Sequence, residues 1–102
     1  MVYLVTIFPV ADYDEYAAVL ERNTDTYVRL GATRQWVLRA TDDRREVMNV
    51  FEFPSAEQAK AFLRSPEIDV PRFLDSLTLE IYPTFFLGEP TVAREFTAAP
   101  ED

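Results

Sequence analysis

An almost unbroken run of apolar residues opens the chain at residues 2–8. Successive side chains of a β-strand point to opposite sides of its sheet. In this run both sides are largely apolar: one carries Tyr3, Val5 and Ile7, and the other carries Val2, Leu4 and Phe8. A strand of this kind is covered on both sides. The pattern therefore predicts a buried first strand that ends at Pro9.

The spacing of apolar residues then changes to steps of three and four, which is typical of a helix with one buried side. The positions on this side are Tyr13, Tyr16, Ala17, Leu20, Thr24 and Tyr27. Asp12 and Glu15 form the D-x-x-E signature of a capped helix start. Gly31 suits the left-handed position that follows a helix end. One helix is expected from Asp12 to about Leu30.

Two further β-type runs, at residues 32–41 and 46–53, flank a short polar segment at 42–45. This arrangement predicts a β-hairpin, in which pairing of Asp42 with Arg45 sets the register. One face then carries Arg34, Trp36, Leu38 and Ala40 with Val47, Asn49, Phe51 and Phe53, and the other carries Gln35, Val37 and Arg39 with Met48, Val50 and Glu52. A slip of one residue would exchange these faces.

A second capped helix start, Ser55 with Gln58, opens a short helix with Ala59, Phe62 and Leu63 inward. Pro66 ends this helix, because the residue before a proline avoids helical angles. Helical turns are expected over 67–76.

A last strand is expected over 78–87, with an edge or a bulge at Pro83. The predicted order is β-α-β-β-α-β. This order indicates an α+β fold, a ferredoxin-like sandwich with a four-stranded antiparallel sheet and two helices on one face.

The predicted sheet has more apolar surface than two helices can cover, since the first and last strands are apolar on both faces. Each large side chain left in water would cost about 1.5–3 kcal/mol. A second copy packed sheet against sheet removes this cost, so we expect a homodimer through the sheet face. We expect the folded domain to span residues 1–88 and residues 89–102 to form an acidic C-terminal tail.

Composition excludes several classes of site. The 102 residues include no histidine and no cysteine, so no Ser-His-Asp triad, cysteine nucleophile or disulfide framework can form. The two glycines cannot build a phosphate-binding loop. A net charge of −8 disfavours nucleic acid and membrane surfaces as partners. No apolar run reaches the ~20 residues that span a bilayer, and we expect a cytoplasmic protein.

Residues 46–53, followed by 55–63 and Ser65-Pro66, resemble the antibiotic-biosynthesis-monooxygenase-like family. The resemblance implies a dimeric α+β barrel. It also implies activities that include cofactor-independent oxygenation of aromatic polyketides, haem degradation, isomerisation and cyclisation. Family members often carry histidines near the positions of Phe62 and Glu67, so their absence here argues against a haem ligand.

Candidate functional residues lie on the hairpin. Arg34, Trp36 and Asn49 share one predicted face, where they could orient a flat aromatic substrate between sheet and helices. Trp36 could instead fill the core, and Arg34 could lie in solvent. An amide within an apolar strand needs partners when buried, so Asn49 is expected either to contact a ligand or to pair with the local backbone.

Glu52 and Arg39 share the opposite predicted face, where they could form an ion pair at the dimer interface. Glu52 is alternatively a catalytic base with a raised pKa. Tyr16 offers a second proton acceptor, or a phenol that packs in the core. The carboxylates at 12–15 and at 42–43 are explained by a helix start and a turn, so no metal site is predicted.

Two hypotheses follow. In the first, the chain is an enzyme without a cofactor that oxygenates, isomerises or cyclises a small aromatic molecule. Asn49, Trp36, Tyr16 and Glu52 are then catalytic, and Arg34, Trp36, Phe51 and Phe62 bind the substrate. In the second, it is a non-catalytic dimeric binding or scaffold module whose cleft is filled by Trp36, Phe51 and Phe62.

Overall fold

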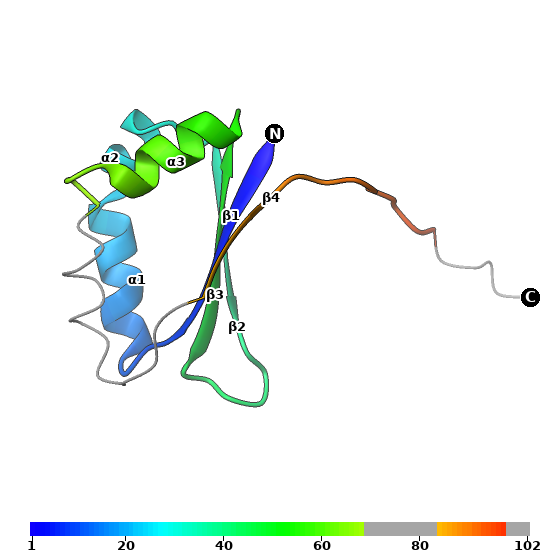
Figure 1. Cartoon of the computed structure of the whole chain (residues 1–102). Helices are drawn as coiled ribbons and strands as arrows, with labels where there is room; N and C mark the ends of the chain where they lie inside the picture. Colours follow the sequence, from blue (N-terminus) through cyan, green and yellow to red (C-terminus); the bar gives the residue numbers. More distant parts are fainter. Residues whose placement is uncertain (69–83, 98–102) are drawn as a thin grey trace, which may run out of the picture.

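The computed structural model describes residues 1–68 and 84–97. Its elements are, in chain order, β1 (Val2–Pro9), α1 (Tyr13–Arg22), α2 (Thr24–Arg29), β2 (Arg34–Arg39), β3 (Glu46–Phe53), α3 (Ala56–Arg64) and β4 (Thr84–Gly88). The strands form one antiparallel sheet in the order β2-β3-β1-β4, and the described helices lie on one side of it (Figure 1). The predicted α+β class and four-stranded antiparallel sheet are confirmed. Residues 69–76 of the expected helical turns and 78–83 of the expected last strand lie outside the described residues.

The first helix begins as its capping signature predicts and ends earlier than expected. Asp12 Oδ1 accepts a hydrogen bond from Glu15 N at 3.2 Å. The prediction of one continuous helix is wrong at Asn23, which lies between α1 and α2. Asn23 Nδ2 donates to the Val19 carbonyl at 2.7 Å and so competes with the backbone for that acceptor. Gly31, with φ at 105°, follows α2 in the left-handed conformation predicted for it.

Replacing Gly31 with alanine is expected to lower the free energy of unfolding by about 1–2 kcal/mol, because a side chain disfavours the left-handed conformation. The new Cβ would also overlap the Gln58 side chain on α3. Chemical denaturation measures the loss. Gly31→Asn adds the same Cβ but tolerates this conformation better, so it should lose less. Equal losses in the two variants would contradict the backbone explanation.

The hairpin register differs from the predicted one by one residue. Trp36 pairs with Val50, and Arg34 pairs with Glu52. Ala40 N donates to the Glu46 carbonyl at 2.9 Å, so the loop spans 41–45 and is no two-residue turn. Tight two-residue turns require positive φ, which suits glycine or asparagine, and the segment 42–45 contains neither. Each β2 side chain therefore lies on the face of the sheet opposite to the predicted one. Trp36, for example, shares a face with Val50 and not with Phe51.

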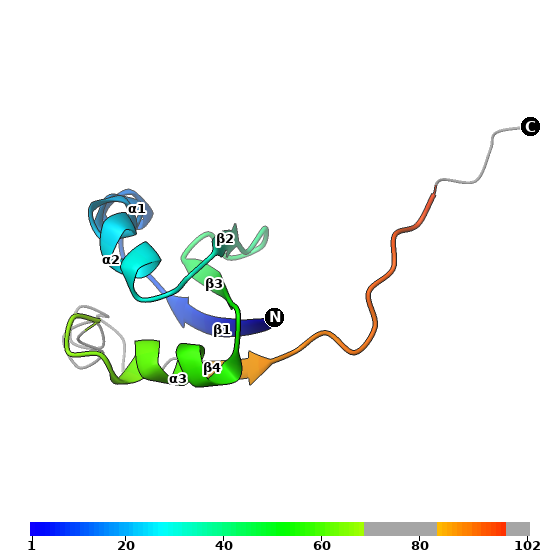
Figure 2. The ribbon, with the colours of Figure 1, turned by 90° about the horizontal axis from the view of Figure 1, so that it is seen from above.

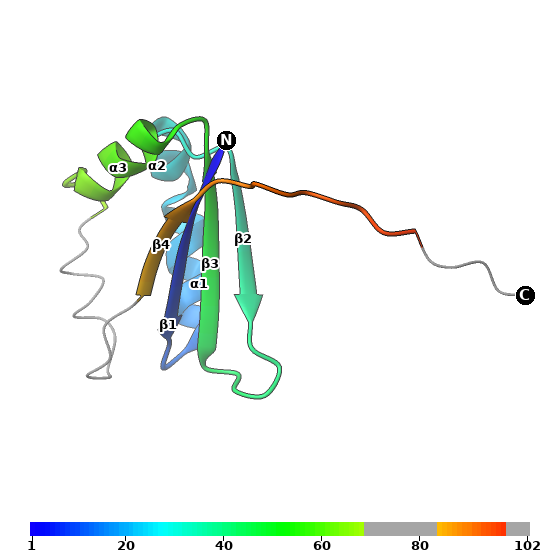
Figure 3. The ribbon, with the colours of Figure 1, turned by 45° about the vertical axis from the view of Figure 1, so that its right-hand side comes forward.

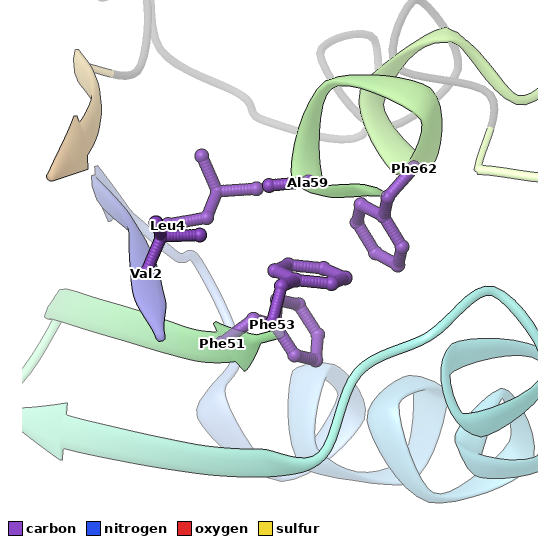
Figure 4. Packing of buried hydrophobic residues seen from close by; sticks show 6 residues of the cluster. All are labelled: Val2, Leu4, Phe51, Phe53, Ala59 and Phe62. Carbon is purple, nitrogen blue, oxygen red and sulfur yellow. The ribbon is translucent and has the colours of Figure 1, made fainter. Parts of the chain in front are cut away.

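The core on the helix side of the sheet is divided into two clusters. The larger one contains Val2, Leu4, Phe51, Phe53, Ala59 and Phe62 (Figure 4). The smaller one contains Phe8, Val10 and Val47. Between them β1 and β3 carry Thr6 and Asn49, which are paired in the register and buried. Polar side chains thus occupy the gap between two apolar clusters.

The side of the sheet away from the helices, which we call the open face, is apolar and uncovered by the described helices (Figure 3). Its apolar residues are Tyr3, Val5, Ile7, Trp36, Leu38, Met48, Val50 and Phe86. Leu38 is 53% exposed and Phe86 is 64% exposed. Contiguous apolar surface of this kind is typical of a protein interface.

Candidate functional site

A cavity of about 600 Å³ lies between the sheet and the helices, at the gap that divides the core. Its sheet side is formed mainly by Leu4, Thr6, Phe8, Asn49 and Phe51. Its helix side is formed mainly by Tyr16, Leu20, Tyr27 and Phe62. The volume falls within the range of small-molecule sites, and the walls combine aromatic surface with a few polar groups.

The polar groups on the sheet side are ordered by a side-chain hydrogen bond. Gln35 Nε2 on β2 donates to Asn49 Oδ1 on β3 at 2.8 Å. The Asn49 carbonyl oxygen is thereby held by a neighbour. The Asn49 Nδ2 hydrogens have no hydrogen-bond partner among the described residues, so they can donate to a bound molecule. Thr6, directly opposite Asn49, adds a hydroxyl to the same wall.

Two tyrosines supply phenol groups to the helix side of the cavity. The Tyr16 ring packs edge-on against Phe8 with centroids 5.3 Å apart, and the Tyr27 ring packs against Phe51 at 5.0 Å. Burial raises the pKa of both phenols, and for Tyr16 the neighbouring tyrosines add to this effect. Both are therefore protonated at neutral pH. Tyr16 is thus suited to donate a hydrogen bond rather than to accept a proton.

Two charged residues, Arg22 and Glu67, are among those that line the cavity. Arg29 Nη1 on α2 lies 2.7 Å from Glu67 Oε2, and Glu67 follows α3. Both side chains are about half exposed, so the pair adds little to stability. Only Glu67 of the two lines the cavity. Arg22, at the end of α1, also lines the cavity. Arg22 and Glu67 are exposed, and the other lining residues in the described part of the chain are uncharged.

Glu52 lies on the open face, away from the cavity. Its Oε1 accepts a hydrogen bond from Thr33 Oγ1 at 2.9 Å, and its Oε2 lies 3.9 Å from Arg34 Nη1. The Tyr3 hydroxyl also hydrogen-bonds to this carboxylate, which raises the pKa of Tyr3. The predicted pairing of Glu52 with Arg39 is wrong, because the shifted register places Arg39 on the helix side, with its guanidinium 4.3 Å from the centre of the Tyr13 ring.

The same shift separates the other predicted site residues. Asn49, Phe51, Phe62 and Tyr16 line the cavity. Arg34 and Trp36 lie on the open face, where the Arg34 guanidinium is 5.3 Å from the centre of the Trp36 ring. The prediction that these two share a face with Asn49 is wrong. Neither Trp36 nor Arg34 contributes to the cavity wall.

Sequence reasoning missed Thr6 and Gln35. Thr6 is the one polar residue in the series Val2, Leu4, Thr6 and Phe8 on the helix side of β1. This polar residue in an apolar series was a usable signal, because Thr6 pairs across the sheet with Asn49, the polar residue in the apolar series of β3. Gln35 was assigned to the wrong face by the register error.

Within residues 1–68 and 84–97, no group of three or more acidic side chains is arranged to hold a metal ion. A search of the described helices found no segment with the length and apolar character needed to cross a membrane.

No family model and no curated protein matches this sequence. Solved structures do match. A mutant of SnoaB, a cofactor-independent oxygenase from Streptomyces nogalater, has a TM-score of 0.74 at 19% identity, over 90% of this chain and 94% of that one. A structure named as an antibiotic biosynthesis monooxygenase has a TM-score of 0.67 at 12% identity, over 90% and 100%. The chain has the fold of the antibiotic biosynthesis monooxygenases.

The resemblance seen in residues 46–66 is therefore confirmed for the fold. A dimeric ferredoxin-like protein from an uncultured marine organism also matches, with a TM-score of 0.64 at 16% identity over 93% of this chain and 99% of that one. Its name describes a ferredoxin-like fold, as predicted here from the order of strands and helices.

Proposed function

We propose that the cavity binds a small planar aromatic molecule and promotes its oxygenation by dioxygen without a cofactor. The observation that carries this proposal is the cavity between the two core clusters, where Asn49, Thr6 and Tyr16 present hydrogen-bond donors to a space whose other walls are largely aromatic and aliphatic. A likeness in fold to a cofactor-independent oxygenase supports it. Isomerisation or cyclisation of the same class of molecule would use the same donors.

Oxygenation without a cofactor needs a substrate whose anion can react with dioxygen directly. An anthrone is such a molecule: transfer of a proton from its CH₂ group to water gives a phenolate-like anion, which adds O₂ to form a peroxide anion, and this anion takes a proton back from water to give a hydroperoxide. Loss of water then leaves the quinone, so one anthrone and one O₂ give one anthraquinone and one water. The negative charge of the anion rests largely on the carbonyl oxygen, where hydrogen-bond donors stabilise it.

The cavity supplies such donors from two directions. Asn49 Nδ2 donates from the sheet, with its amide held in orientation by Gln35. Tyr16 offers its phenol O–H from α1, and burial, which raises its pKa further, keeps this group protonated over the whole neutral range. Phe51 and Phe62 offer ring surface against which a flat molecule can stack. Lowering the energy of the substrate anion favours loss of the proton to water, without a strong base in the cavity.

We further propose that two copies associate through the open face. The exposed Leu38 and Phe86 support this, as does the likeness to a dimeric ferredoxin-like protein. Burial of this apolar surface supplies the driving force. Under this arrangement the Glu52 carboxylate and Trp36 belong to the interface, while each subunit keeps its own cavity.

Oxygen consumption with an anthrone tests the proposed reaction. The protein, treated with a chelator to remove adventitious metal, is expected to accelerate uptake of O₂ with equal formation of anthraquinone, followed by its absorbance. Binding of the anthrone without faster oxygen uptake would instead support the non-catalytic binding module. An absence of binding for flat tricyclic aromatics would contradict the proposed ligand class.

Replacing Asn49 with leucine should lower kcat for the anthrone by about 100-fold, the usual effect of removing a donor to a developing oxyanion. Tyr16→Phe removes the second donor while keeping its ring, and a reduction of similar size is expected. Trp36→Phe is the matched control, because Trp36 lies on the other face of the sheet. A larger loss in Trp36→Phe than in Asn49→Leu would place the chemistry elsewhere.

A further inference from the structure

Residues 89–97 form an arm that leaves the body of the chain directly after β4 (Figure 1). No backbone hydrogen bond joins the arm to the rest of the described chain. Seen from above, the helices lie on one side of the sheet and the arm runs out on the other, the side of the open face (Figure 2). The arm therefore extends into the space that a second copy would occupy.

Two large apolar side chains of the arm are left in solvent. Val92 is 67% exposed and Phe96 is 88% exposed. In an extended segment, residues four positions apart point to the same side, so Val92 and Phe96 form one apolar edge about 13 Å long. An extended chain with free backbone groups and a one-sided apolar edge is suited to lie along another protein surface.

We propose that the arm of each subunit packs on the surface of the second subunit, with Val92 and Phe96 as its anchors. This inference rests on the dimer through the open face proposed above. Continuity supports it, because the arm begins beside Phe86, an exposed residue of that face. In a symmetric dimer each arm would pack on the other subunit, which is an exchange of terminal segments between the two copies.

Limited digestion with trypsin tests where the arm lies, because Arg94 stands between the two anchors. In the wild-type dimer, cleavage after Arg94 is expected to be at least about tenfold slower than in Val92→Ser/Phe96→Ser at the same subunit concentration, since docking limits access to the bond. Mass spectrometry measures the rate at which the chain loses the fragment that begins at Glu95. Dilution to the monomer should abolish the protection. Protection that persists in the monomer would place the arm on its own subunit and overturn the proposal.

The dissociation constant of the dimer, measured by sedimentation, gives a second test. Val92→Ser/Phe96→Ser should raise it about 10- to 100-fold, because each subunit loses buried apolar area. Thr91→Ser/Thr97→Ser, in the same arm, should leave it unchanged. An unchanged constant in the first variant would overturn the arm proposal and leave the dimer standing. A wild-type protein that is monomeric at all concentrations would overturn the dimer and, with it, the arm.

Discussion

Replacing Leu38 with glutamate is expected to convert the proposed dimer into monomers, with the dissociation constant raised at least about a thousandfold. Leu38 is 53% exposed on the open face, so the change does little to an isolated subunit. In a two-fold dimer the substitution occurs twice, and each new carboxylate would be moved from water to an apolar interface without a partner. Burial of an unpaired charge costs several kcal/mol. Sedimentation velocity over a range of subunit concentrations measures the shift.

Val28→Glu provides the matched control for this experiment. Val28 is 64% exposed on α2, on the opposite side of the sheet. The substitution therefore adds the same charge at an exposed apolar residue away from the open face. The control should remain dimeric. Dissociation of both variants to the same extent would show that added negative charge, on a chain with a net charge of −8, is responsible, and would contradict the assignment of the interface.

Phe53→Ala should lower the free energy of unfolding by about 3–5 kcal/mol, the range found for phenylalanine removed from a close-packed core. Phe53 is 0% exposed and packs against both Phe51 and Phe62, with ring centroids 6.2 and 5.0 Å away. Removal of the ring therefore leaves an empty space between β3 and α3. Urea denaturation measures the loss at a fixed subunit concentration, because dissociation contributes to the unfolding of a dimer.

Phe53→Leu keeps most of the side-chain volume and should lose much less, about 1.5 kcal/mol. A comparable loss in the two variants would indicate that the aromatic contacts, and not the volume, hold this cluster together. A loss below about 1 kcal/mol for Phe53→Ala would contradict its place at the centre of the core.

The strands, helices and their order could be predicted because local signals specify them. Asp12 and Ser55 accept the capping hydrogen bonds that their spacing predicts, at 3.2 Å in each case. Gly31 has the positive φ that a helix end favours. The break at Asn23 was missed because its cause is a side chain that bonds to a carbonyl four residues back, and the apolar periodicity continues across it.

The candidate site depended on one turn, and that turn was the weakest signal in the sequence. The segment 42–45 is polar and contains no glycine, so its residues do not fix the length of the loop. An error of one residue moved Trp36 and Arg34 to the wrong face and removed Gln35 from the right one. Asn49 was identified correctly as a polar interruption of an apolar face, because that pattern does not depend on the hairpin register.

The most direct test of the site uses side-chain signals in an amide NMR spectrum. The Asn49 and Gln35 amide groups report on the cavity, and the indole N–H of Trp36, the single tryptophan, reports on the open face. Titration with a hydroxylated anthraquinone should shift the two amide signals and leave the indole signal unchanged. A shift of the indole signal with unmoved amides would contradict a site between sheet and helices.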